Sequence, residues 1–267
     1  MNRIEEKFSV MKDGGRSALV CYLTAGDPSI ELTRDIVLEL EKNGADIIEL
    51  GIPFSDPMAD GPTIQLASER ALAKGTTIHD VINLSKELRE HTEIPIILFG
   101  YYNPFFTYGL EKFADDAKKA GVDGILVVDL PPEESEEFKN HLDKNDLNLI
   151  FLLAPTSTDK RIDLVSDNAG GFIYLVSVTG VTGSRPGMEY SLSSLTKDIK
   201  LKSGIPVGIG FGVSTPEQAK DISQYADAVI VGSALVRIIE KNGTERDALL
   251  KEIGQFTDSL SGSCFKN

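Results

Sequence analysis

The fold is decided by one stretch, DIIELGIPFSDPMADGPTIQ, which runs from Asp46 to Gln65. It begins with an apolar run typical of a strand, continues through a loop rich in proline, glycine and aspartate, and ends where an amphipathic helical pattern begins. Apolar runs with little polar alternation are typical of parallel strands that are buried on both faces. The stretch therefore predicts one strand–loop–helix unit.

The same alternation of strand and helix continues along the whole chain. The predicted strands are 18–24, 46–51, 95–99, 123–129, 147–153, 171–177, 205–210 and 226–231. The predicted helices are 29–43, a pair within 62–90, 110–120, 132–145, 158–168, 191–203, 215–223 and 233–259. Each strand is thus followed by at least one helix, a rhythm that requires right-handed crossovers.

Eight such units in 267 residues predict a (β/α)8 TIM barrel, an architecture of about 250 residues. Ile4, Phe8 and Met11 lie at helical spacing and add a short helix before the first strand. The alternative is a doubly wound open sheet, but no G-x-G-x-x-G follows the first strand and no change in composition marks a second domain. We expect one α/β domain, residues 1–267, built as a barrel with an extra N-terminal helix.

Composition narrows the possible partners. The net charge of −14 argues against a nucleic acid or an anionic membrane, because both require basic patches. No apolar run is close to the length of about 18 residues that a membrane span needs. The N-terminus lacks the apolar core of a signal peptide. The two cysteines and three histidines have no metal-ligand spacing. We therefore expect no metal site, and the cytoplasm as the compartment.

Glu49 and Asp60 place two carboxyl groups on one strand–helix connection. In TIM barrels the active site lies at the carboxyl ends of the strands, and alternation puts Glu49 on the same strand face as Ile47. A carboxyl group buried there without a partner has a raised pKa, which suits a general acid or base. The alternatives are that Glu49 points outward to a helix and that Asp60 is a turn or capping residue.

Glycine clusters follow three of the later strands, at 180–183, at 208–212 and at Gly232-Ser233. Loops of this kind, together with the N-terminus of the following helix, form the usual phosphate site of a barrel. The alternative is that these glycines only turn the chain. The long loop 178–190 is typical either of a lid that closes over substrate or of a disordered surface segment.

Four blocks of the sequence resemble the alpha-subunit family of tryptophan synthase: ELGIPFSDPMADGPTIQ, SVTGVTG, GIGFGVSTPEQ and VGSALVRIIE. The segments DGILVVDLPPEES and FLLAPTS are also similar, so the resemblance covers essentially the whole chain. It implies a lyase of tryptophan biosynthesis that performs retro-aldol cleavage of indole-3-glycerol phosphate to indole and glyceraldehyde 3-phosphate.

The resemblance also implies roles for individual residues. Glu49 matches the family's catalytic glutamate, which protonates carbon 3 of the indole ring, and Asp60 matches the aspartate that accepts the ring N–H. Thr182 matches the lid threonine that contacts Asp60. Tyr22 is phenylalanine in some relatives, which leaves its hydroxyl without a role. The implied contacts to indole and phosphate are Tyr22, Ile64, Tyr174, Gly183, Phe211, Gly212, Gly232 and Ser233, with the strand ends near Leu126 and Val128.

The same resemblance implies a partner, the beta subunit, in an α2β2 heterotetramer. The beta subunit holds pyridoxal phosphate, and no cofactor is expected in this chain. Candidate segments for the interface are 53–60 and 101–104, because exposed aromatic side chains beside Asn-Pro would be unusual on a free surface. The alternative is that these aromatic residues belong to the core.

Two other functions remain open. A non-catalytic regulatory subunit that binds a sugar phosphate would need the glycine clusters but not both Glu49 and Asp60. A phosphosugar isomerase on the same barrel would need a different acid–base pair. Asp129 ends the fourth predicted strand, but no partner for it is evident at the matching place.

Overall fold

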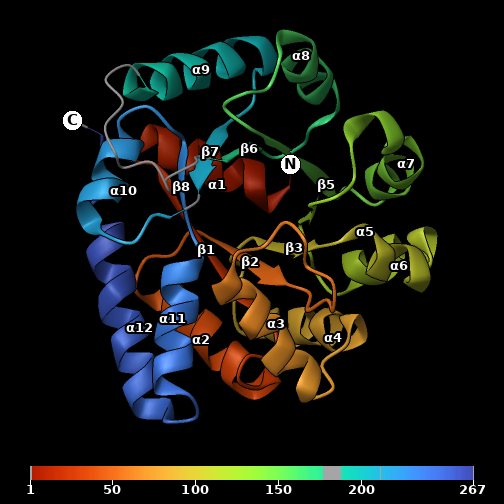
Figure 1. Cartoon of the computed structure of the whole chain (residues 1–267), viewed down its shortest axis with the longest axis vertical. Coiled ribbons are helices and arrows are strands. Elements are labelled where there is room, and N and C mark those ends of the chain that lie inside the picture. The colour runs from red at the N-terminus through yellow and green to blue at the C-terminus, as the bar shows by residue number, and fades with distance from the viewer. Residues whose placement is uncertain (1, 177–187, 211, 267) are drawn as a thin grey trace.

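The computed structural model describes residues 2–176, 188–210 and 212–266. Its strands are β1 (Ala18–Thr24), β2 (Ile47–Gly51), β3 (Ile96–Gly100), β4 (Gly124–Val127), β5 (Asn148–Leu153), β6 (Ile173–Val176), β7 (Val207–Gly210) and β8 (Ala228–Val231). All are parallel, each pairs with its neighbour in the chain, and β1 pairs with β8 to close the barrel (Figure 1). The predicted (β/α)8 TIM barrel is confirmed, and every predicted strand lies within two residues of an observed one.

Helices surround the barrel on all sides. They are α1 (Arg3–Asp13), α2 (Ile30–Lys42), α3 (Pro62–Ala73), α4 (Ile78–Leu88), α5 (Tyr102–Tyr108), α6 (Leu110–Lys119), α7 (Glu136–Lys144), α8 (Asp159–Asn168), α9 (Met188–Ser203), α10 (Pro216–Ser223), α11 (Ser233–Asn242) and α12 (Arg246–Ser261), with a 3-10 turn η1 (Pro132–Glu134). No helix in the described ranges is both long and apolar enough to cross a membrane.

Three helix predictions were wrong in detail. The predicted helix 233–259 is two helices, because Gly243 adopts φ +53 and interrupts the backbone hydrogen bonds. The predicted helix 132–145 begins as a separate 3-10 turn that ends at Ser135. Helix α5 was not predicted at all. Its Asn103-Pro104 pair resembles a turn, but proline is tolerated in the first turn of a helix.

The N-terminal helix α1 closes one end of the barrel. Asn2 and Glu5 form a reciprocal capping box that fixes its start. Ile4 and Phe8 are buried among the inward side chains of the strands, and the rings of Phe8 and Phe172 lie 5.6 Å apart. Because α1 fills the amino-terminal end of the barrel, a site for a ligand is left at the carboxyl ends of the strands.

The C-terminal helix α12 completes the outer layer. It contacts α2 and α11, so the end of the chain packs beside the first strand–helix unit (Figure 1). The buried residues between strands and helices form one continuous apolar layer outside the barrel, separate from the cluster inside it. These two layers fix the positions of the strand ends and therefore of the residues that follow them.

Candidate active site

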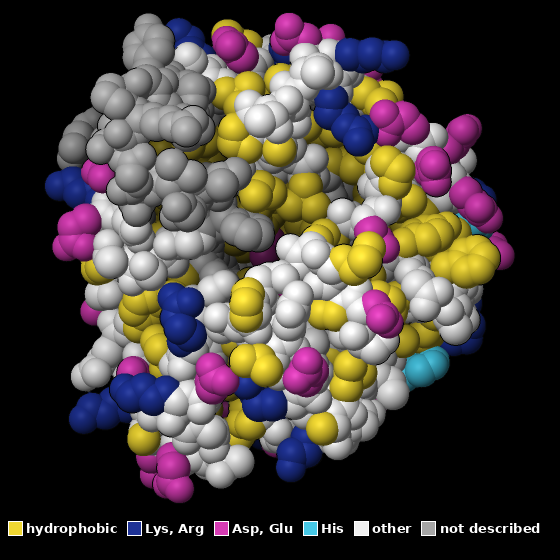
Figure 2. Space-filling view, viewed as in Figure 1, with side chains coloured by type: hydrophobic (Ala, Val, Ile, Leu, Met, Phe, Trp, Pro, Cys, Tyr) yellow, Lys and Arg dark blue, Asp and Glu magenta, His cyan; other side chains and the backbone are white. Residues whose placement is uncertain are grey.

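A pocket opens at the carboxyl ends of the strands, with a volume of about 560 Å³ that includes its open mouth. Figure 2 shows the hollow in this face of the molecule, with hydrophobic side chains at its rim. Its lining in the described part of the chain is Tyr22, Glu49, Asp60, Gly61, Ile64, Phe99, Tyr174, Gly212, Ile230, Gly232 and Ser233. Eight of the site residues expected from sequence are therefore brought together from five different strand–loop segments. Thr182, Gly183, Phe211 and most of the loop 178–190 lie outside the described residues.

Glu49 points into the barrel from β2. It pairs in register with Tyr22 of β1 and Ile97 of β3, and it shares the inward face with Ile47. Only 1% of Glu49 is exposed, and its Oε1 has no hydrogen-bond partner in the described part of the chain. Burial raises the pKa of this carboxyl from 4.5 to about 8. Glu49 therefore carries a proton at neutral pH, and the outward-pointing alternative is wrong.

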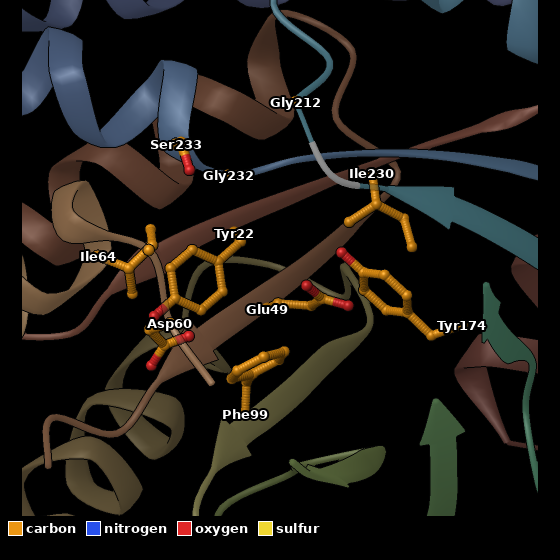
Figure 3. A pocket seen from close by; sticks show the side chains of 11 residues that line it. Tyr22, Glu49, Asp60, Ile64, Phe99, Tyr174, Gly212, Ile230, Gly232 and Ser233 are labelled. Carbon is orange, nitrogen blue, oxygen red and sulfur yellow. The ribbon is translucent and has the colours of Figure 1, made fainter. Parts of the chain in front are cut away.

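Two phenol rings flank the Glu49 carboxyl group. Figure 3 shows it between Tyr22 and Tyr174, with Phe99 beside it. The Tyr22 hydroxyl, which had no role in the sequence analysis, lies 3.3 Å from Thr24 Oγ1. The Tyr22 and Phe99 rings pack edge to face with centroids 5.1 Å apart. The acid therefore lies in an aromatic environment that excludes water and keeps it protonated.

Asp60 lies across the pocket, in the loop before α3. Its Oδ2 accepts a hydrogen bond of 3.0 Å from the Tyr101 hydroxyl, and its backbone oxygen accepts one of 2.8 Å from Gln65 Nε2. Burial raises the pKa of the Asp60 carboxyl, and the Tyr101 hydrogen bond opposes that rise. The capping alternative is wrong, because the N-cap residue of α3 is Gly61 and this helix start has no side-chain cap.

Sequence analysis missed several residues at this site. Tyr101 was expected in an exposed interface segment, but only 5% of it is exposed and its ring stacks on Phe54 with centroids 5.2 Å apart. Phe99 and Ile230 also line the pocket. Strand alternation from Ile97 could have found Phe99, because both residues face inward.

Two residues expected near the pocket wall are absent from its described lining. Leu126 belongs to the apolar cluster inside the barrel, and Val128 packs against the same cluster. Asp129, the candidate acid of an isomerase, accepts a hydrogen bond of 2.7 Å from the backbone N–H of Tyr102 at the start of α5. Neither Asp129 nor these two apolar residues is part of the pocket lining in the described chain.

The glycine end of the pocket lies opposite the loop of Asp60. Gly212 adopts φ +79, a conformation that favours glycine. Gly232 is the last residue before α11, and Ser233 begins the helix. The first backbone N–H groups of a helix have no partner within the helix and carry partial positive charge. This end of the pocket therefore offers an anion site without a basic side chain in its described lining.

The described residues contain no cluster of histidine, cysteine and carboxylate side chains that could hold a metal ion. Large apolar side chains are exposed in the loop of Asp60 and in α5. Met58, in the loop of Asp60, is 92% exposed, and Phe106 in α5 is 60% exposed.

Comparison with known proteins gives one consistent result. The family model described as tryptophan synthase alpha chain matches residues 8–262. The chain is 52% identical to the tryptophan synthase alpha chain of Geobacter sp. (strain M21), over 100% of this chain and 99% of the relative. It is 48% identical to that of Thermoanaerobacter sp. (strain X514), over 97% and 98%. Tryptophan synthase subunit alpha from Legionella pneumophila superposes with a TM-score of 0.92 at 39% identity, over 99% and 98% of the two chains. The chain belongs to the tryptophan synthase alpha chain family.

Proposed function

We propose that this protein is a lyase of tryptophan biosynthesis that cleaves indole-3-glycerol phosphate into indole and glyceraldehyde 3-phosphate. The observation that carries the proposal is the buried, protonated Glu49 facing the same pocket as a second carboxyl group, Asp60. Family membership supports the same reaction. Residues 1–267 act as one domain, because the eight strands close a single barrel and the last helix packs on the first unit.

The reaction needs a proton delivered to carbon 3 of the ring. Glu49 donates this proton, which places positive charge on the ring nitrogen. The resulting Glu49 carboxylate accepts the proton of the side-chain hydroxyl next to the bond that breaks. The electrons of that carbon–carbon bond return to the ring, indole leaves, and the former alcohol carbon becomes the aldehyde of glyceraldehyde 3-phosphate. A carboxyl group with a pKa of about 8 suits both transfers near neutral pH.

Asp60 holds the other side of the ring. Its carboxylate accepts the ring N–H and stabilises the positive charge that develops on the nitrogen. The indole ring packs against the apolar wall of Tyr22, Ile64 and Tyr174, with Phe99 and Ile230 added to it. The family resemblance implies Phe211 for the same wall and Thr182 as a contact of Asp60, and both residues lie outside the described ranges.

The phosphate group binds at the glycine end of the pocket. Gly212, Gly232 and Ser233 allow backbone N–H groups to approach it, and the start of α11 adds its partial positive charge. Gly183 contributes from the loop before α9. This local arrangement compensates for the net charge of −14, which repels an anionic substrate at long range.

The partner that we propose is the tryptophan synthase beta subunit, in an α2β2 heterotetramer. Pyridoxal phosphate belongs to that subunit, and this chain carries out its step with side chains alone. Met58, which is 92% exposed, lies on one of the two segments expected at the interface and supports this contact. We infer the cytoplasm as the compartment, consistent with two cysteines that are both free thiols.

Indole release from indole-3-glycerol phosphate, measured with and without added beta subunit, tests the proposal. We expect release by the chain alone and faster release with the partner. Glu49→Gln should lower the rate by about 100-fold or more, because general acid–base catalysis contributes roughly that much. Its affinity for a phosphate ligand should stay within a few-fold. Binding without any release would instead identify a regulatory subunit.

A further inference from the structure

We propose that Tyr101 is a positioning residue, which orients Asp60 toward the ring nitrogen of the substrate by a hydrogen bond from outside the pocket. The proposal rests on the function proposed above and adds a residue to it. Tyr101 is not part of the described pocket lining, so it acts through Asp60 and not on the substrate.

The direction of the hydrogen bonds is fixed by their partners. The backbone N–H of Ala59 donates to Tyr101 Oη at 3.0 Å, and Tyr101 Oη lies 3.0 Å from Asp60 Oδ2. Because a backbone N–H can only donate, it occupies a lone pair of the phenol oxygen, and the single phenol proton points to the carboxylate. Tyr101 therefore ties two consecutive residues of the loop to the end of β3.

The ring that carries this hydroxyl is well anchored, whereas the loop around Asp60 is not. Tyr101 is 5% exposed and stacks on Phe54 at an interplanar angle of 27°. Ser55, Asp56, Met58 and Ala59 are all exposed, so little side-chain packing holds the loop. Hydrogen bonds therefore position Asp60, and among the described residues the Tyr101 bond is the one that reaches its carboxylate.

This bond has two consequences for the chemistry. It uses Oδ2, and within the described residues the structure shows no hydrogen bond to Oδ1, which leaves that oxygen for the ring N–H. It also favours the ionised form of Asp60, whose pKa burial raises. An ionised and oriented acceptor is what the developing positive charge on the ring nitrogen requires.

Tyr101→Phe tests the proposal, because it removes the hydroxyl and keeps the stacked ring. We expect kcat/KM for indole release to fall by about 10- to 100-fold, the effect of losing one hydrogen bond to a charged group. The acid limb of the pH profile, which reports Asp60, should move to higher pH, because the hydrogen bond that lowers the Asp60 pKa is lost. The alkaline limb, which reports Glu49, should stay in place. The thermal midpoint of unfolding should change by no more than a few degrees.

Tyr108→Phe is the matched control. Tyr108 also donates to a carboxylate, Asp116, at 2.8 Å, but on the outer surface of α5 and α6. The same loss of a tyrosine–aspartate bond there should leave kcat/KM and both limbs of the profile unchanged. An unchanged acid limb in Tyr101→Phe overturns the proposal, whether or not the rate falls.

A second measurement separates this proposal from the proposed function. The titration of the Asp60 carboxyl carbon, followed by NMR in the ligand-free protein, should show a higher pKa in Tyr101→Phe than in the wild type. If this shift occurs but the wild type releases no indole, the proposed function fails and the link between Tyr101 and Asp60 stands. If indole is released and the Asp60 titration does not move, the positioning role of Tyr101 is wrong.

Discussion

The Tyr22 hydroxyl lies directly over the α-carbon of Gly51 on the neighbouring strand. A β-carbon at Gly51 would lie 2.3 Å from Tyr22 Oη and 2.7 Å from its Cζ, closer than such atoms approach in proteins. The phenol ring can therefore line the pocket beside Glu49 only because β2 carries no side chain at this position. A similar relationship holds across the barrel, where a β-carbon at Gly210 would lie 2.3 Å from Tyr174 Oη.

We expect Gly51→Ala to move the Tyr22 ring into the pocket. The added methyl group would lie within 3 Å of three atoms of the Tyr22 ring and hydroxyl, so the ring must shift. The variant should lose about 1–3 kcal/mol of unfolding free energy and raise KM for the substrate at least several-fold. Denaturant unfolding and steady-state kinetics check both effects. Gly262→Ala, where the nearest atom is 3.4 Å away, is the matched control and should change neither quantity.

The buried Glu49 makes folding dependent on pH. Its pKa is 4.5 in the unfolded chain and about 8 in the folded protein, so the folded state holds its proton more tightly. As pH rises from 4.5 to 8, the unfolded state gains an ionisation that the folded state lacks, and stability is lost. Glu49→Gln removes this titration, so over that range its stability should improve relative to the wild type by an amount on the order of 4 kcal/mol.

Urea titrations of both proteins at pH 4.5, 6 and 8 check this prediction. The difference between the two unfolding free energies should grow steadily with pH. A constant difference would show that Glu49 ionises in the folded protein as easily as in water, and the proposed role as an acid near neutral pH would lose its basis.

Gly232→Val should weaken phosphate binding without unfolding the protein. A β-carbon there would lie 3.3 Å from Tyr22 Cδ1, and the two methyl groups of valine need more space than that contact leaves. We expect the affinity for glyceraldehyde 3-phosphate, measured by calorimetry, to fall about 10-fold or more, because the backbone N–H groups can no longer approach the anion. Gly14→Val, at the exposed end of α1, should retain the wild-type affinity. Equal affinities in both variants would remove Gly232 from the phosphate site.

An ion pair with a buried carboxylate supports the loop that follows β1. Arg70 Nε and Nη2 in α3 both donate to the Asp27 carboxylate at 2.8 Å, and Asp27 is 1% exposed. Arg70→Met leaves that charge buried without its partner, which costs about 3–5 kcal/mol. The comparison variant is Arg246→Met, which breaks an exposed pair with Asp35 and should cost less than about 1 kcal/mol. Thermal unfolding of the two variants, measured in parallel with the wild type, would show whether Arg70→Met loses more stability than Arg246→Met.

The architecture could be predicted because each strand and helix leaves a local pattern of apolar residues in the sequence. Strand runs such as 18–24 follow from apolar periodicity, and each predicted strand was found within two residues of its observed bounds. Helix α5 and the break at Gly243 were not predicted. Whether a proline stands in the first turn of a helix, or a glycine adopts φ +53, depends on how neighbouring elements pack. Local preference is a weak guide wherever tertiary contacts override it.

The amino-acid sequence was enough to predict the barrel, the shared strand face of Glu49 and Ile47, and a site at the carboxyl ends of the strands near Asp60, Gly212 and Gly232. Strand alternation and the fixed location of barrel sites are enough for that. Only the tertiary structure decided the charge state of Glu49, because its pKa depends on burial and on the absence of a partner in the described chain. The hydrogen bond from Tyr101 to Asp60 was likewise decided there, since it joins residues 41 positions apart that no sequence spacing relates.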